Sequence, residues 1–136
     1  MYTTETKLQV QYYETDQMGV VHHSNYIRYY ETARTDFIKS LGVSYRQLEE
    51  SGTAMPIITV GCKYIQPAVY DEVLTVKTTL KELPTSRITF YYEVYNQAGK
   101  LINEGYTMLA FINQETQRPS RAPEILMERL RPLFAE

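Results

Sequence analysis

The chain of 136 residues contains no tryptophan and only one cysteine, Cys62, and it has no long run of apolar residues. A single cysteine excludes an internal disulfide and a zinc site built from several cysteines. The absence of about eighteen consecutive apolar residues argues against a membrane-spanning helix. Residues 1–10 are polar and lack the apolar core of a signal peptide. We therefore expect no membrane anchor and a reducing, cytoplasmic location.

A charge excess of one sign is also lacking, because 14 Lys and Arg face 16 Asp and Glu, for a net charge of −2. Nucleic-acid binders usually carry a basic face, so we expect no nucleic-acid partner. The apolar fraction of 43% and the charged fraction of 22% are typical of a soluble globular protein, and the length fits one domain over residues 1–136. Tyrosine is abundant, with 13 copies, and it suits pockets and interfaces that are partly apolar and partly wet.

Strand-like patterns occupy most of the chain. Apolar and polar residues alternate over residues 6–13, which is the period of a half-buried strand. Four further runs are rich in β-branched and aromatic residues and are bounded by Pro, Gly or Asn, at residues 57–65, 72–83, 86–96 and 100–113. Short turns join three of these four runs, which favours antiparallel pairing of sequential strands.

A helical pattern interrupts the strands at residues 25–41. Apolar residues recur there at spacings of three or four, from Tyr26 to Leu41, which predicts an amphipathic helix with a wide buried face. We expect Ser24 or Asn25 to cap its start and Gly42 to end it. Shorter helices are predicted over residues 44–51 and 124–134.

These elements together predict a two-layer α+β domain, in which an antiparallel five-stranded sheet wraps around one long central helix. The sheet should curl around the helix because strands twist. Its exposed edges can pair with other chains, so we expect two subunits to pair edge to edge as a homodimer.

Reactive side chains gather in residues 12–26, between the first strand and the long helix. The start of a helix leaves unpaired N–H groups and a partial positive charge, which can hold an anion or a developing oxyanion. A nearby carboxylate such as Asp16 can act as a general base or as a nucleophile, and Gly19 lets the backbone approach a substrate closely. By itself, an aspartate such as Asp16 is more often a turn-forming or helix-flanking residue than a catalytic one. The adjacent His22 and His23 make a poor metal site, because their side chains diverge and no third ligand is evident.

The run Thr15-Asp16-x-x-Gly19-Val20-Val21-x-His23-x-x-Tyr26 resembles the signature of the 4-hydroxybenzoyl-CoA thioesterase family of hotdog-fold acyl-CoA thioesterases. The resemblance spans about residues 6–125, and its further matches follow in the family's order: Tyr29-Tyr30-Glu31-x-Ala33-Arg34, Tyr64-x-x-Pro67-Ala68, Asp71-Glu72 and Arg121-x-Pro123. It is similar in particular to the short bacterial acyl-CoA thioesterases associated with the Tol-Pal system.

The resemblance implies a hotdog fold that assembles as a homodimer or a homotetramer, with acyl-CoA as substrate and the active site at the subunit interface. Asp16 matches the catalytic aspartate, which attacks the thioester carbonyl or activates water to do so. The backbone N–H of His23 matches the group that polarises the thioester oxygen, and its side chain matches a histidine linked to activity. The positions expected to contact substrate are Tyr12, Gly19, Val20, His22 and Tyr26.

Hydrolysis of a thioester is chemically modest, since the thiolate leaves readily, so we expect one carboxylate and oxyanion donors to suffice without a metal or cofactor. Two other functions stay open. A hotdog hydratase or dehydratase would use a histidine such as His23 for proton transfer at carbon. A non-catalytic acyl-CoA-binding protein would hold the same ligand without releasing a thiol.

Overall fold

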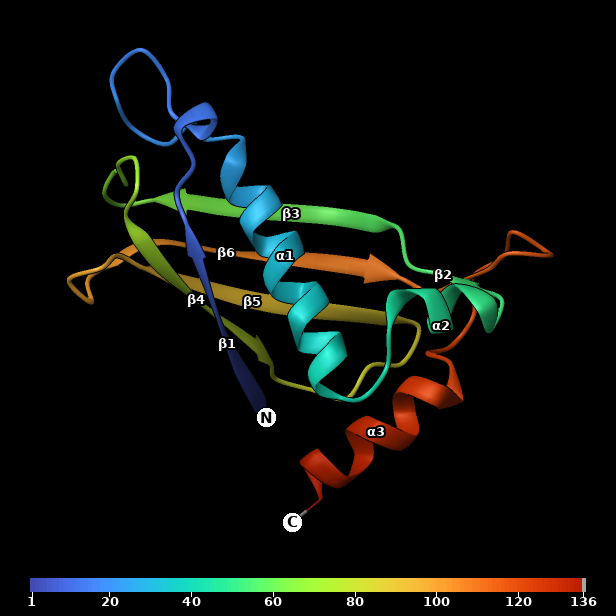
Figure 1. Cartoon of the computed structure of the whole chain (residues 1–136). Coiled ribbons are helices and arrows are strands. Elements are labelled where there is room, and N and C mark those ends of the chain that lie inside the picture. Colours follow the sequence, from blue (N-terminus) through green and yellow to red (C-terminus); the bar gives the residue numbers. More distant parts are fainter. Residues whose placement is uncertain (136) are drawn as a thin grey trace.

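A five-stranded antiparallel sheet with a helix against one face forms the frame of the molecule in the computed structural model, which describes residues 1–135 (Figure 1). In chain order the elements are β1 (Tyr2–Gln9), a 3-10 turn η1 (Tyr12–Glu14), α1 (Asn25–Ser40), α2 (Tyr45–Glu50), β2 (Thr53–Ala54), β3 (Ile57–Tyr64), β4 (Val73–Leu80), β5 (Arg87–Tyr95), β6 (Leu101–Ala110), β7 (Ile112–Asn113) and α3 (Glu124–Phe134). The predicted α+β class and the five antiparallel strands are confirmed.

The strand order in the sheet is β1-β4-β5-β6-β3. Strands β4, β5 and β6 pair in sequence, as their short connections predicted. β1 pairs with β4 and β3 pairs with β6, so these two strands form the edges of the sheet. The two-residue strands β2 and β7 form a second small sheet, so the single strand predicted over residues 100–113 is divided between β6 in the main sheet and β7 in the small one.

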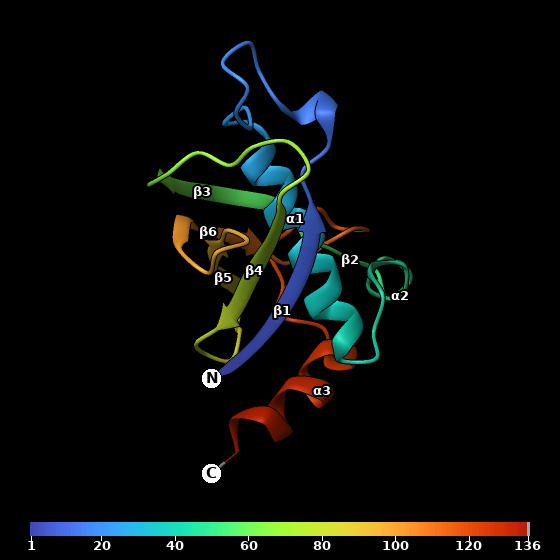
Figure 2. The same cartoon turned by 60° about the vertical axis from the view of Figure 1, so that its left-hand side comes forward.

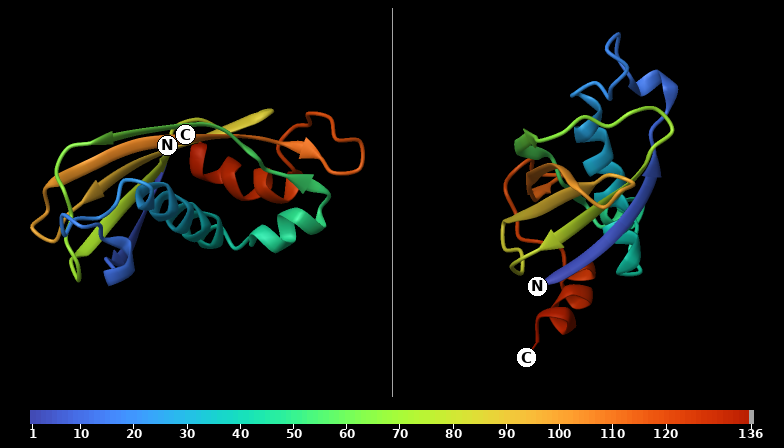
Figure 3. Two further views of the ribbon diagram at one scale, coloured as in Figure 1. Left: turned by 90° about the horizontal axis from the view of Figure 1, so that it is seen from above. Right: turned by 90° about the vertical axis from the view of Figure 1, so that its left-hand side faces the viewer.

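Helix α1 packs against the inner face of the sheet, which arches over it (Figure 3). Figure 2 shows β1 running beside α1. Phe37 packs edge-on against the rings of Tyr2 and Phe90, each at a centroid distance of 5.2 Å. Tyr30 stacks on Tyr92 at 4.3 Å. These rings fix the helix relative to the edge strand β1 and the central strand β5, and thereby fix where its first turn lies.

Two further details of the prediction are wrong. The first strand was expected over residues 6–13 but spans Tyr2–Gln9, because the chain folds into the 3-10 turn η1 at Tyr12–Glu14. The start of α1 has no side-chain cap: Ser24 is already helical, and the Asn25 amide donates to the Glu14 carbonyl instead.

The remaining helix boundaries follow the sequence closely. Gly42 ends α1 with a positive φ of 81°, as predicted for a glycine at that position. The Ser44 side chain caps α2 by accepting from the Gln47 N–H, and α3 begins and ends at the predicted residues. Among residues 1–135, no helix is both long and apolar enough to cross a membrane.

Gly105 of β6 faces α1 at a point of close approach. A Cβ atom there would overlap the Gly61 carbonyl and the buried Tyr30 hydroxyl. A Cβ on Gly61 would instead meet the ring of Tyr106, a partly exposed side chain that is able to move.

We therefore expect Gly105→Ala to lower the free energy of unfolding by about 1–3 kcal/mol, the usual effect of overpacking a rigid site. The matched variant Gly61→Ala should lower it by clearly less, because only a mobile ring must shift. Denaturant titration followed by circular dichroism measures both values, and equal losses would contradict this explanation.

Candidate active site

The segment that carries Asp16 is a small hairpin between η1 and α1. Thr15 and Val21 form a β-bridge, and the Asp16 N–H donates to the Val20 carbonyl at 2.9 Å. The turn closes where the Gly19 N–H donates to the Asp16 carbonyl at 3.0 Å. Gly19 has a φ of 79°, a left-handed conformation that glycine adopts without strain. Asp16 therefore sits at the first position of a tight, hydrogen-bonded turn.

The two carboxylate oxygens of Asp16 have different surroundings. Oδ1 accepts from the Met18 N–H at 2.8 Å and from the Val20 N–H at 3.4 Å. Oδ2 has no hydrogen-bond partner within the described residues 1–135, and the side chain is half-buried. The loop thus holds one oxygen in place and leaves the other available to a ligand.

The beginning of α1 offers a free donor next to this carboxylate. The His22 carbonyl accepts from Asn25 at 3.0 Å, and the His23 carbonyl accepts from Tyr26 at 3.3 Å. The His23 N–H itself donates to no acceptor in the part of the chain that the structure describes. The partial positive charge of a helix N-terminus adds to this donor, so the position favours an anionic oxygen.

Asp16 and His23 line one pocket of about 360 Å³. Its walls come from the hairpin, from the first turn of α1 and from the segment that ends β3: Asp16, Met18, Val20, Val21, His23, Tyr26, Tyr64, Ile65, Gln66 and Pro67. Most of these side chains are apolar or aromatic. The pocket can therefore take an apolar group and present its polar end to a carboxylate and an N–H donor.

Tyr64 joins β3 to the start of α1. Its ring packs edge-on against Tyr26 at 5.5 Å and against His23 at 6.3 Å, and its hydroxyl donates to the His23 carbonyl at 3.3 Å. The strand end and the helix start are thereby held together around the pocket.

Four of the residues expected from the sequence meet at this pocket, namely Asp16, Val20, His23 and Tyr26. Gly19 shapes the turn without lining the pocket.

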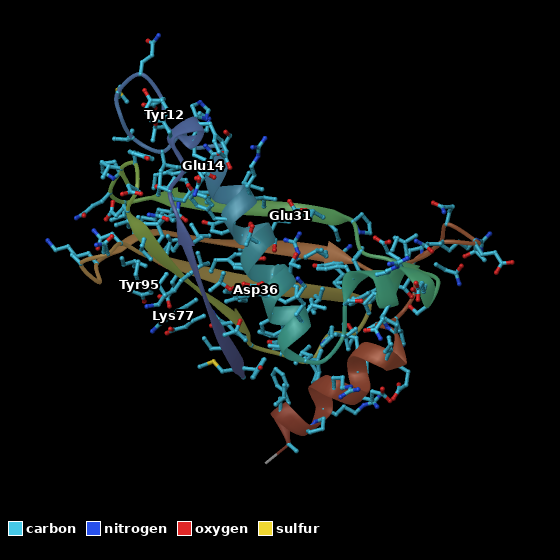
Figure 4. The ribbon with its side chains drawn as sticks, viewed as in Figure 1. Tyr12, Glu14, Glu31, Asp36, Lys77 and Tyr95 are labelled. Carbon is cyan, nitrogen blue, oxygen red and sulfur yellow. The ribbon has the colours of Figure 1, made fainter. Side chains whose placement is uncertain are left out.

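His22 and Tyr12 also lie outside the pocket lining. His22 is exposed and its Nδ1 shares a hydrogen bond with Ser24. Tyr12 is 75% exposed and its ring packs against Tyr70 at 5.5 Å. Figure 4 shows Tyr12 beside the hairpin.

The sequence reasoning did not single out the wall formed by residues 64–67. The motif at the helix start lies within residues 12–26, whereas this wall comes from the end of β3, which is distant in sequence. The run Tyr64-x-x-Pro67, part of the family resemblance, was the one signal that pointed to it.

Tyr26 is buried in the pocket wall, and the ionisation of its phenol offers a test of that burial. Desolvation raises the pKa of Tyr26 from 10.0 to about 12. The folded protein therefore keeps this proton to higher pH than the unfolded chain does, so its contribution to stability is complete below about pH 10 and is lost as the pH rises toward 12.

We expect Tyr26→Phe to remove this part of the alkaline decline in the free energy of unfolding. Denaturant titrations over a pH series measure it, with Tyr13→Phe as the matched control, since that phenol is 78% exposed. An identical alkaline decline in wild type and Tyr26→Phe would contradict the assignment.

Comparisons with known proteins agree with the geometry. Residues 10–130 match the family model of the thioesterase-like superfamily. The putative acyl-CoA thioesterase YneP of Bacillus subtilis is 32% identical over 119 residues, which is 88% of this chain and 86% of the relative.

Two solved structures are similar over nearly the whole chain. The DHNA-CoA thioesterase from Staphylococcus aureus has a TM-score of 0.85 and 34% identity, with 98% of this chain and 87% of that chain covered. The hypothetical protein TT1821 from Thermus thermophilus has a TM-score of 0.88 and 37% identity, with 99% and 100% covered. These matches confirm the predicted family resemblance: the chain belongs to the thioesterase-like superfamily.

Proposed function

We propose that this chain hydrolyses acyl-CoA thioesters to a free carboxylic acid and CoA, with Asp16 as the catalytic carboxylate. The observation that carries this proposal is that one largely apolar pocket is lined by Asp16 and by His23, whose N–H donates to no acceptor within residues 1–135. Relatives named as acyl-CoA thioesterases support the substrate class.

In the proposed reaction, the thioester carbonyl oxygen accepts a hydrogen bond from the His23 N–H. Asp16 either removes a proton from the attacking water or attacks the carbonyl carbon itself. In both cases the tetrahedral intermediate collapses, the carbon–sulfur bond breaks, and the CoA thiolate leaves and takes up a proton. Where Asp16 is the nucleophile, water then hydrolyses the resulting anhydride and regenerates the Asp16 carboxylate. An oxyanion donor is typically worth about 2.7–4 kcal/mol of transition-state stabilisation. His23 lines the same pocket, and the proposal assigns its imidazole to the transfer of that proton.

The acyl group is assigned to the apolar side of the pocket, where Val20, Tyr26 and Tyr64 form the walls. Gly19, Tyr12 and His22 lie on the same loop or its flanks but do not line this space, so the proposal gives them no direct contact with the acyl group. The thioester carbonyl of the substrate then points toward Asp16.

The proposal also covers the hotdog fold and the cellular location. We take α1 as the long central helix of a hotdog fold, with the arched sheet as its wrapping. The free thiol of Cys62 fits the reducing cytoplasm expected from the sequence.

A dimer through β3 is part of the proposal. This edge strand and the residue that follows it expose large apolar side chains: Ile57 at 42%, Ile58 at 47%, Val60 at 37%, Tyr64 at 51% and Ile65 at 42%. An edge with unpaired backbone groups and exposed apolar side chains is suited to pairing with another chain. Because Tyr64 and Ile65 also line the pocket, pairing along β3 would bring the partner subunit to the active site.

Asp16→Asn tests the chemistry with little change to the loop, because the asparagine oxygen can still accept from the Met18 N–H. We expect kcat for acyl-CoA hydrolysis to fall by at least about 10²-fold, the lower range for loss of a general base. A thiol-release assay over short, branched, long and aromatic acyl-CoAs measures this.

Asp36→Asn is the matched control, since Asp36 lies on α1 and outside the pocket. Full hydrolysis by Asp16→Asn would overturn the proposal. Consumption of an enoyl-CoA by wild type without thiol release would favour a hydratase, and binding without turnover of any thioester would favour a binding protein.

Val60→Glu tests the dimer. The new carboxylates would face a desolvated position in a paired β3 edge, so we expect the variant to be monomeric and to lose most of its hydrolysis. Lys7→Glu on β1, the other edge, should leave the assembly unchanged. Analytical ultracentrifugation measures both, and an unchanged dimer, or a wild-type chain that sediments as a monomer, would refute pairing through β3.

A further inference from the structure

Glu14 lies two residues before Asp16 and ties the base of the hairpin to α1. Its backbone carbonyl accepts two hydrogen bonds, one from the His22 N–H and one from the Asn25 side-chain amide, both at 2.9 Å. Asn25 is the first residue of α1 and is only 7% exposed. The segment that leads from η1 into Asp16 is therefore joined directly to the start of α1.

The side chain of Glu14 makes a second connection to the same helix. Its Oε1 accepts from the Gln11 N–H at 2.7 Å and from the Tyr29 hydroxyl at 3.0 Å. Tyr29 is 4% exposed and lies one turn beyond Asn25. Burial, together with the charge of Glu14, raises the pKa of Tyr29, so its hydroxyl remains a donor at neutral pH. The Glu14 carboxylate thus links Gln11, two residues beyond the end of β1, to Tyr29 on α1.

The hairpin beyond Glu14 is internally braced by the hydrogen bonds of Asp16 with Met18, Gly19 and Val20. Its position is set on one side by the Val20–Val69 bridge and by the bond from the Val21 N–H to the Ala68 carbonyl, and its connection to α1 is made at its base, where Glu14 makes its contacts. Both reacting groups of the proposed site depend on this joint, because Asp16 is on the hairpin and the His23 N–H is at the helix start.

From this arrangement we infer that Glu14 and Tyr29 are positioning residues that set the Asp16 carboxylate against the His23 N–H. The inference rests on the proposed function, since the alignment of Asp16 affects the rate only if Asp16 carries the chemistry. Glu14 does not line the pocket and its Oε1 is already engaged, which distinguishes it from a second catalytic carboxylate.

Tyr29→Phe is the sharpest test, because it removes the hydroxyl and keeps the buried ring. We expect kcat to fall by about tenfold while KM for the acyl-CoA changes by less than about twofold, since small misplacements of reacting groups affect the rate strongly. Glu14→Ala should lose at least as much, and Glu14→Gln should retain most of kcat, since its amide oxygen can accept both hydrogen bonds.

Thr6→Val is the matched control. The Thr6 hydroxyl donates to the Asp36 carboxylate at 2.9 Å, which is another hydroxyl–carboxylate bond between α1 and the preceding strand. Figure 4 shows Glu14 at the start of α1 and Asp36 farther along the helix. Thr6→Val should lower stability while leaving kcat unchanged. Denaturant titration of every variant fixes a temperature at which all of them are folded during the assay.

Several results would overturn the inference. Wild-type kcat in Tyr29→Phe, or an equal loss in Thr6→Val, would show that the bond acts only on stability. Equal losses in Glu14→Gln and Glu14→Ala would show that the charge of Glu14, and not its geometry, matters. An inactive Asp16→Asn beside a fully active Tyr29→Phe would overturn this inference alone, whereas an active Asp16→Asn would overturn the proposed function and the inference with it.

Discussion

The packing of α1 beneath the arched sheet is the constraint on which the site depends. The stack of Tyr30 on Tyr92 and the edge-on contacts of Phe37 with Tyr2 and Phe90 hold the helix against the central strand β5 and the edge strand β1. A helix held in this way cannot shift along its axis without opening a cavity, and such cavities typically destabilise proteins by several kcal/mol. Its first turn is therefore a rigid reference point for every group around it.

Around that reference point, three segments that are distant in sequence contribute different parts. The hairpin supplies a carboxylate, the helix start supplies an N–H donor, and the end of β3 supplies an aromatic wall through Tyr64. Each part has an ordinary structural explanation by itself, since aspartate is common in turns and helix starts always leave free donors. Because all three parts line one pocket, the arrangement is a candidate active site.

Repeating patterns and motifs in the sequence predicted the main elements and the candidate site residues. Individual side-chain contacts could not be predicted from it. The spacing of apolar residues from Tyr26 to Leu41 predicted α1 closely, and Gly42 marked its end because few other residues adopt its conformation readily. Asp16 and His23 were identified by a motif. The side-chain role of Asn25 could not be predicted, since its bond to Glu14 depends on how the loop folds back onto the helix. The wall at Tyr64 required knowledge of strand order, which pairs β3 with β6 and not with its sequence neighbour β4.

The start of α1 lacks a stabilising contact that the chain makes at another helix. The Ser24 hydroxyl is engaged with His22 and leaves the helix without a side-chain cap. A cap at this position is commonly worth about 0.5–2 kcal/mol, so the fold forgoes that stabilisation. A capping side chain at residue 24 would accept from the N–H groups of residues 26 or 27 and would leave the His23 N–H, which precedes the cap, without a new partner. A helix-cap substitution could therefore raise the heat resistance of this end of α1 without blocking the donor of the proposed site, whereas α2 already carries such a cap at Ser44.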